Sequence, residues 1–257
     1  MGRSLKYEIP GDDPRVSPEQ VAQLGWASLF ARARERVSST APGDPGIAPA
    51  VASGLIPAHT SAHTSAHTSD VANTRERRRV LEIGFGRGEF LLALAATSPD
   101  SDFVGIEVSW KRALKLARKV ARARNPNVLL VVGRGEDALG DWFDPQSLAE
   151  IWVNFSDPWP KLRHAERRLI QPTFAALAAR ALTPGGTLFV ATDDVPYAHQ
   201  IDETLAGEKG LLNRHAPLAF LPEVPGRMTT GYEAQWRAEG RPLHFFAYAA
   251  SGEGAAR

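Results

Sequence analysis

From about residue 79 onward, apolar positions alternate between two spacings. Short apolar runs, which predict buried strands, occur at residues 80–84, 102–107, 128–132, 150–155, 187–191 and 243–249. Helical spacing occurs at residues 89–97, 110–124 and 195–205, and along the segment that follows residue 155 and runs through 182. Alternation of strands and helices predicts an α/β fold with a mostly parallel sheet.

The chain before this alternation has a different pattern. Residues 1–37 form an N-terminal extension in which the spacing over 17–37 predicts a short helix. Residues 38–74 are rich in Ala, Pro, Ser, Thr and Gly, repeat Ala-His-Thr-Ser three times, and are predicted to be a disordered linker. His59, His63 and His67 would share one helical face and could ligate a metal. A solvated linker explains them better, so we predict no metal site.

Composition limits the classes of function. A chain of 257 residues with 43% hydrophobic content fits one α/β domain with an appendage. The net charge of +1 means that nucleic-acid binding would depend on local basic clusters. With no cysteine, disulfides, thiolate metal sites and cysteine nucleophiles are excluded. The polar first 14 residues, and the lack of any apolar run of about 18, lead us to expect a cytoplasmic protein without a membrane anchor.

The first predicted strand runs into a glycine-rich turn. Residues 80–89 read Val-Leu-Glu-Ile-Gly-Phe-Gly-Arg-Gly-Glu, a pattern typical of a nucleotide-cofactor turn. Glu89 stands where a dinucleotide motif needs its third glycine, which favours S-adenosylmethionine over a nicotinamide cofactor. Glu107 ends the second strand, where a carboxylate can accept both ribose hydroxyls. A tight structural turn, and a Glu107 that caps the helix starting near Ser109, are the alternatives.

A second motif, Asn-Phe-Ser-Asp-Pro-Trp-Pro-Lys at residues 154–161, follows the fourth predicted strand. Asp157 can accept hydrogen bonds from the edge of a base, and Trp159 offers a stacking face. The cationic side chains beyond suit phosphate; they are Lys161, Arg163, His164, Arg167 and Arg168. Alternatively, Asp157 caps a turn before Pro158, and the basic stretch is a solvated face. A further basic set on residues 111–124 is interpreted as the outer face of an amphipathic helix and is left out of the site.

Together with Gly105-Ile106-Glu107-Val108, Gln171-Pro172 and Ala191-Thr192-Asp193, these motifs resemble the bacterial tRNA (guanine-N7-)-methyltransferase family over residues 79–248. The resemblance implies the Rossmann-like class I methyltransferase fold, with a seven-stranded sheet whose last strand is antiparallel, in a domain spanning 75–257. It also implies S-adenosylmethionine as cofactor, tRNA as partner, and methylation of N7 of the variable-loop guanosine.

The resemblance also implies roles for particular residues. Asp157 would be catalytic. The residues expected to bind the cofactor are Glu82, Gly84, Gly86, Gly88, Glu107, Asp137 and Asp157. Those expected to bind substrate are Lys161, Asp193, Thr230, Tyr232 and Glu233. For Glu82 a brace of the glycine turn, and for Asp137 a helix cap, remain open as structural alternatives.

The sequence departs from the family pattern near its C-terminus. Gly231 stands where a lysine is usual, Asp194 replaces a frequent aromatic or His, and residues 234–240 are less basic. These departures keep open a methyltransferase that acts on another RNA, a small molecule or a protein. A non-catalytic RNA-binding relative is disfavoured because Glu107 and Asp157 are present, and a nicotinamide dehydrogenase is disfavoured by Glu89. The oligomeric state cannot be predicted from these patterns.

Overall fold

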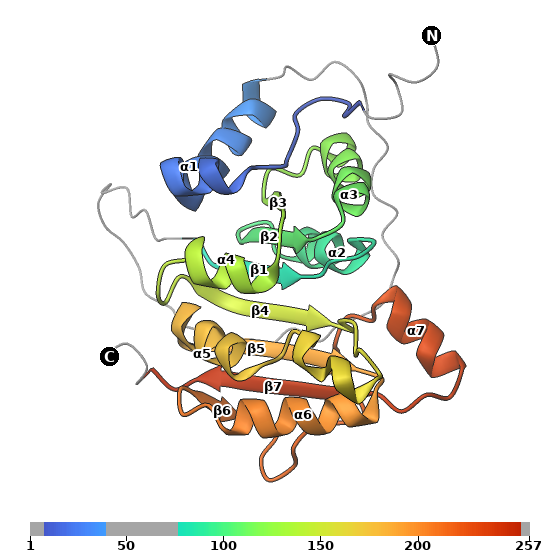
Figure 1. Ribbon diagram of the computed structural model, residues 1–257. Helices are drawn as coiled ribbons and strands as arrows, with labels where there is room; N and C mark the ends of the chain where they lie inside the picture. The colour runs from blue at the N-terminus through green and yellow to red at the C-terminus, as the bar shows by residue number, and fades with distance from the viewer. Residues whose placement is uncertain (1–7, 40–76, 253–257) are drawn as a thin grey trace, which may run out of the picture.

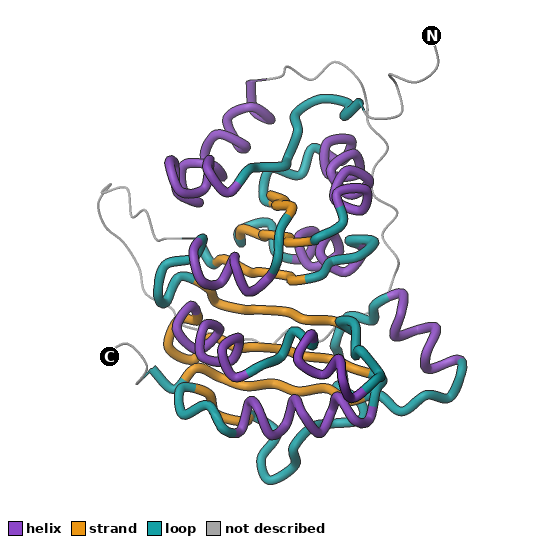
Figure 2. The backbone as a smooth tube through the Cα atoms, in the orientation of Figure 1, coloured by secondary structure: helices purple, strands orange, loops and turns teal. Residues whose placement is uncertain are grey.

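Seven strands form one twisted sheet with helices on both faces in the computed structural model, which describes residues 8–39 and 77–252 (Figure 1, Figure 2). The strands are β1 (Arg79–Ile83), β2 (Asp102–Glu107), β3 (Val128–Val132), β4 (Leu148–Asn154), β5 (Leu182–Thr192), β6 (Leu211–Asn213) and β7 (His244–Ala250). Their order is β3-β2-β1-β4-β5-β7-β6. β1 to β5 pair in parallel, whereas β7 is antiparallel to β5 and to β6, which confirms the expected architecture.

The helices are α1 (Pro18–Ser39), α2 (Glu89–Thr97), α3 (Trp110–Ala123), α4 (Gly135–Asp141), the 3-10 helix η2 (Leu162–Arg167), α5 (Pro172–Ala181), α6 (Val195–Ala206) and α7 (Gly231–Ala238). The helix predicted to run from residue 155 through 182 is wrong in its first part. A loop and η2 come first, and α5 begins only at Pro172, which stands in its first turn. Pro158 and Pro160 disfavour a helix earlier, because proline restricts the residue before it.

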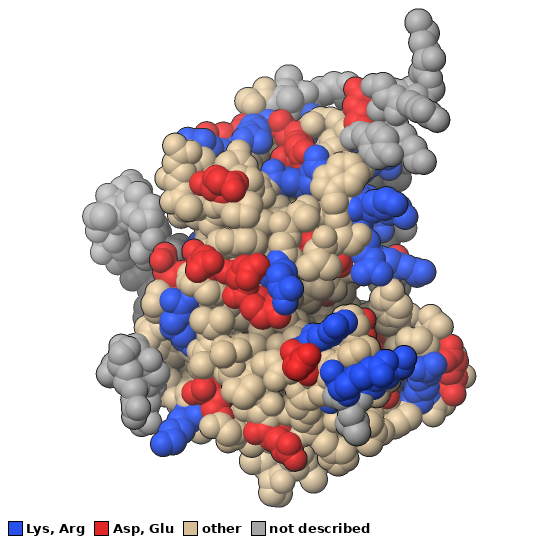
Figure 3. Space-filling view, in the orientation of Figure 1, with Lys and Arg blue, Asp and Glu red and all other residues tan. Residues whose placement is uncertain are grey.

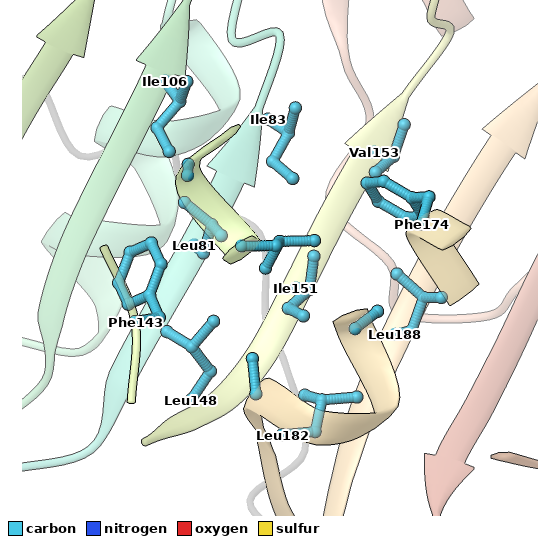
Figure 4. Packing of buried hydrophobic residues seen from close by; sticks show 14 of the residues in the cluster. Leu81, Ile83, Ile106, Phe143, Leu148, Ile151, Val153, Phe174, Leu182 and Leu188 are labelled. Carbon is cyan, nitrogen blue, oxygen red and sulfur yellow. The ribbon is translucent and has the colours of Figure 1, made fainter. Parts of the chain in front are cut away.

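Both faces of the sheet are buried, which explains why the strands read as continuous apolar runs. Every residue of β1 and of β2 is buried. Figure 4 shows one cluster, in which Leu81 and Ile83 of β1 lie near Ile151 and Val153 of β4, with Phe174 of α5 beside them. A second cluster includes residues from β1, β2 and β3 with α2 and α3. Two-sided burial holds the carboxyl ends of the strands in fixed positions.

The N-terminal helix α1 contributes to the same core. Trp26 stacks on Phe143, with ring centroids 5.1 Å apart, and its indole Nε1 donates a hydrogen bond of 2.7 Å to the carbonyl of Trp142. The polypeptide that follows, including the Ala-His-Thr-Ser repeat and its histidines, lies outside the described residues. Within the described ranges, no helix has the length and apolar character needed to cross a bilayer.

The strand order reverses between β1 and β4. From β1 the chain proceeds outward to β2 and β3, and then returns to β4 and continues in the opposite direction. At such a switch point, the segments leaving two neighbouring strands diverge and open a crevice at the carboxyl ends. The glycine turn follows β1, and the second motif begins at the last residue of β4 and continues through residues 155–161, so the fold brings the two predicted motifs to one crevice.

Candidate active site

A cleft of about 460 Å³ lies at this crevice. It is lined by the turn after β1, the loop after β4, the end of β5 and the start of α7. The predicted site residues along it are Glu82, Gly84, Gly86, Gly88, Asp157, Asp193, Thr230 and Tyr232. Residues from four separate parts of the chain therefore share one cavity.

The glycine turn requires glycine for two different reasons. Gly84, Gly86 and Gly88 have φ angles of +75°, +54° and +70°, in the left-handed region that residues with a Cβ rarely adopt. At Gly88 a Cβ would also lie 2.3 Å from Cδ2 of Leu116, so α3 packs directly against the turn. The turn is thus a rigid cradle whose backbone is exposed to a ligand at Gly84.

Glu82 is a buried acid with an unused oxygen. Glu82 is only 2% exposed, and its Oε1 accepts a hydrogen bond of 3.3 Å from Nδ2 of Asn154. Among the described residues, Oε2 makes no hydrogen bond of normal geometry, although the backbone N–H of Leu91 also favours the ionised carboxylate. Burial raises the pKa of Glu82 to about 7, although Asn154 and the charge of Arg227 favour the ionised form. A buried acceptor at the floor of a cleft is suited to a donor on a bound ligand.

Glu107 lies behind the turn. Its Oε2 accepts from the backbone N–H of Gly86 at 3.1 Å, and its Oε1 accepts from that of Ser109 at 3.0 Å. The carboxylate therefore joins the glycine turn to the start of α3, which is the alternative role considered for it. Glu107 is not among the residues that line the cleft, so its contact with a ribose stays a prediction.

The loop after β4 has an unusual backbone. Phe155 and Trp159 have φ angles of +53° and +44°, and such left-handed conformations in bulky residues cluster at functional sites. Asp157 is exposed at the cleft, and its Oδ1 accepts a hydrogen bond of 3.0 Å from the backbone N–H of Trp159. One oxygen of Asp157 thus shapes the turn while the residue faces the cleft, so the two roles proposed for it are compatible.

The basic residues beyond the loop divide into two groups. Arg168 is only 4% exposed, and its guanidinium donates to the carbonyl of Pro158 and to Oε1 of Gln200, both at 2.7 Å. It supports the Asp157 loop from inside, and the interpretation of Arg168 as an exposed phosphate contact is wrong. Lys161, Arg163 and Arg167 are exposed outside the cleft.

Trp159 lies outside the cleft lining. The guanidinium of Arg167 lies 5.1 Å from its ring centroid, and the ring of His164 packs edge-on at 5.8 Å. Its predicted role in stacking a base stays untested. Two other aromatic residues, Tyr232 and Trp236 on α7, do line the cleft.

A wall formed by α7 and the following loop was only partly predicted. Tyr232 and Trp236 lie one helical turn apart, with ring centroids separated by 6.4 Å. The guanidinium of Arg241 lies 3.9 Å from the Trp236 ring, and its Nη1 is 3.0 Å from Oδ2 of Asp193 at the end of β5. Sequence reasoning missed Trp236 and Arg241. The i, i+4 spacing of two aromatics was the available signal for one face of a helix.

The start of α7 forms a capping box. Thr230 Oγ1 accepts from the backbone N–H of Glu233 at 3.0 Å, and the Glu233 side chain accepts from that of Thr230. The buried carboxylate of Glu233 is also ion-paired to Arg227 and Arg237. Because this carboxylate is already bonded within the protein, the expected contact of Glu233 with substrate stays a prediction.

Asp137 lies apart from these groups. It stands exposed in the first turn of α4, next to Glu136, and does not line the cleft. Its predicted cofactor contact therefore remains unsupported by the cleft geometry. In Figure 3, Lys and Arg gather along the right-hand edge, where the parallel strands end in Figure 1, and acidic side chains gather over α4.

The parallel sheet with one antiparallel strand, the glycine turn at the switch point and the acid-lined cleft define a class I methyltransferase. The same fold is found in the 16S rRNA methyltransferase KamB, which is 18% identical, with a TM-score of 0.52 over 68% of this chain and 88% of that one. A family model described as "Putative methyltransferase" matches residues 76–246.

Two relatives are similar over most of their length. The tRNA (guanine-N(7)-)-methyltransferase of Geobacter metallireducens is 35% identical over 176 residues, which are 68% of this chain and 83% of the relative. The tRNA (guanine-N(7)-)-methyltransferase of Halorhodospira halophila is 36% identical over 174 residues, which are 68% of this chain and 75% of the relative. The chain belongs to this methyltransferase family.

Proposed function

We propose that the protein transfers the methyl group of S-adenosylmethionine to N7 of guanosine in tRNA, at the variable-loop guanosine. The observation that carries this proposal is the shared cleft. Its lining includes the glycine turn, the buried Glu82, the exposed Asp157 and the partly buried Asp193, which pairs with Arg241. The names of the two relatives support the same substrate. Because its substrate would be tRNA, we infer a cytoplasmic location.

The cofactor half of the cleft fits S-adenosylmethionine. The left-handed glycine turn leaves room for a ligand against its backbone, and Glu82 offers a buried acceptor to a ligand ammonium group. Glu107 holds the turn from behind through the N–H of Gly86. When bound, the cofactor supplies a methyl group on a sulfonium centre.

The substrate half fits a guanine. N7 of guanine carries an in-plane lone pair, so no side chain has to remove a proton from the nucleophile, and catalysis is chiefly a matter of position. Asp157 can accept hydrogen bonds from N1–H and the amino group of guanine, a donor pair that adenine lacks. A carboxylate there also stabilises the positive charge that the purine acquires.

The wall of α7 is suited to a base removed from its stack. Tyr232 is 42% exposed and faces the cleft beside Trp236, and aromatic side chains bind unstacked bases in single-stranded segments of RNA. Exposed cations suit the phosphates of the RNA: Arg87, Arg112 and Arg241 line the cleft, and Lys161, Arg163 and Arg167 lie outside it on the segment that follows β4. Local charge compensates for a net charge near zero.

Incubation of the purified protein with labelled S-adenosylmethionine and unmodified tRNA transcripts, followed by nucleoside mass spectrometry, tests this function. We expect 7-methylguanosine, and we expect it to disappear when the variable-loop guanosine is changed to adenosine. Binding of the cofactor without any methyl transfer to tRNA would instead favour another substrate, with the altered segment at 231–240 as the cause.

A further inference from the structure

A buried arginine, Arg227, contacts residues from both sides of the cleft but is not among the residues that line it. Arg227 belongs to the segment that leads into α7, and its side chain is 7% exposed. The guanidinium lies 4.8 Å from the ring centroid of Phe245 on β7, 5.5 Å from that of Phe90 on α2 and 5.8 Å from that of Trp152 on β4. Three rings from three elements enclose the charge, so its position is fixed by packing as well as by its bonds.

The polar contacts of Arg227 reach in two directions. Nη1 is ion-paired to Glu233 on α7, and Nη2 donates a hydrogen bond of 2.5 Å to Oδ1 of Asn154 at the end of β4. Asn154 in turn donates through Nδ2 to Oε1 of Glu82. A continuous series of four side chains therefore links the start of α7, which carries Tyr232, to the acid at the floor of the cleft.

We propose that Arg227 is a positioning residue that couples the cofactor wall of the cleft, formed by Glu82 and the glycine turn, to the substrate wall, formed by the loop after β4, the end of β5 and α7. A ligand bound at Glu82 would then favour binding of tRNA at α7. This inference rests on the proposed function, because it assigns the cofactor to one wall and tRNA to the other. Arg227 is not among the site residues predicted from the sequence.

The physical route runs through the amide of Asn154. A donor on Oε2 of Glu82 fixes that carboxylate, and the carboxylate then fixes which end of the amide faces it. With Nδ2 toward Glu82, Oδ1 must face Arg227, and Arg227 holds Glu233 and the first turn of α7. Coupling of this kind is reciprocal and typically changes affinity by about 5- to 150-fold, and we expect a value near the lower end, about tenfold.

The charges around Glu82 give a second, independent signature. The positive charge of Arg227 favours ionised Glu82, the nearby Glu107 opposes ionisation, and Asn154 supports it through its hydrogen bond. Loss of the Arg227 charge should therefore make Glu82 harder to ionise. An Arg227 charge that does not act on Glu82 would leave the pH dependence of cofactor binding unchanged.

The first experiment measures the affinity of the full-length protein for tRNA with and without saturating S-adenosylhomocysteine. We expect the cofactor product to tighten tRNA binding on the order of tenfold in the wild type. Arg227→Lys keeps the charge but loses the planar fork of the guanidinium. In this variant, the ratio of tRNA affinities with and without S-adenosylhomocysteine should fall to about threefold or less. Arg237→Lys is the matched control, because Arg237 pairs with the same Glu233 and makes no bond to Asn154.

Asn154→Ala breaks the series without altering α7, and it should lower the ratio as Arg227→Lys does; it also carries the test if Arg227→Lys does not fold. Retention of the full ratio in these variants, or an equal loss in Arg237→Lys, would overturn the proposal. If the wild type binds no S-adenosylhomocysteine, the proposed function itself fails, and that result is distinguishable from the others.

The second experiment measures S-adenosylhomocysteine binding by calorimetry between pH 5.5 and pH 8.5. Wild-type affinity should rise as the pH rises through about 7, because the ligand ammonium favours ionised Glu82. In Arg227→Gln the midpoint of this pH dependence of affinity should move upward by about half a pH unit or more. In Arg237→Gln the midpoint should not change. Asn154→Ala, which loses the donor to Glu82, should also raise the midpoint. An unmoved midpoint in both Arg227→Gln and Asn154→Ala would contradict the coupling.

Discussion

The two walls of the cleft are built in different ways. The cofactor wall comes mainly from one continuous stretch, in which β1, the glycine turn and α2 follow each other, and Glu107 joins it across 21 positions. The substrate wall combines the loop after β4, the end of β5 and α7, and the bond from Arg241 to Asp193 spans 48 positions. Backbone conformation determines the first wall, whereas side-chain contacts between distant segments determine the second.

The largest expected effect concerns the acid of the substrate wall. Asp157→Ala should lower kcat by about 10²- to 10³-fold, because the carboxylate that holds guanine and stabilises its charge is lost. Dissociation constants for S-adenosylmethionine should change little. Steady-state kinetics and calorimetry measure the two quantities. Asp157→Asn keeps an acceptor for the N–H of Trp159 but no charge, and full activity in this variant would contradict the electrostatic role.

On the cofactor wall, Glu82→Gln should weaken S-adenosylmethionine binding and change how stability depends on pH. The pKa of Glu82 is raised from 4.5 to about 7, so the fold favours its protonated form. That contribution is complete below about pH 4.5 and is lost as the pH rises through about 7; the loss is up to roughly 3 kcal/mol. Because glutamine does not ionise, the stability of unliganded Glu82→Gln should not show this loss. Urea unfolding at pH 5 and pH 8 measures it, and equal pH dependence in both proteins would refute the assignment.

Two glycines of the turn separate backbone strain from steric contact. Gly88→Ala should destabilise the protein by about 2–3 kcal/mol, because its Cβ would lie 2.3 Å from Leu116 in addition to the left-handed φ. At Gly84 no atom lies within 4 Å of a Cβ, so Gly84→Ala should cost only about 1 kcal/mol. Thermal unfolding compares the pair. Equal losses would mean that packing of α3 does not depend on Gly88.

The smallest expected effect on stability lies on the substrate wall. Arg241 is about half exposed, so Arg241→Ala should cost about 1 kcal/mol or less. Its effect on tRNA should be larger, since a cation beside Trp236 and Asp193 is lost. The slope of log affinity against log salt should fall by about one. Salt titrations of tRNA binding test this, and an unchanged slope would exclude a phosphate contact by Arg241.

The same difference between the walls explains what could be predicted from sequence. The strands and the glycine turn are encoded by local patterns, because two-sided burial and left-handed glycines leave traces in adjacent residues, whereas a role for Glu82 is implied only by the family resemblance. Arg227 and Arg241 leave no such trace, since their roles arise from contacts with distant residues, namely Asn154 and Phe245 for Arg227 and Asp193 for Arg241. The Thr-x-x-Glu pattern at Thr230 and Glu233 was a readable sign of a helix start. It marks a structural capping box within the segment that we had predicted only from a resemblance.

The most direct test of the account uses a tRNA in which only the reacting atom is changed. A transcript with 7-deazaguanosine in place of the variable-loop guanosine keeps the edge that Asp157 would bind and lacks the N7 nucleophile. We predict that this RNA still binds, competes with the unmodified transcript, and accepts no methyl group from labelled S-adenosylmethionine. Methyl transfer to it at the rate seen with the unmodified transcript would contradict N7 of that guanosine as the target.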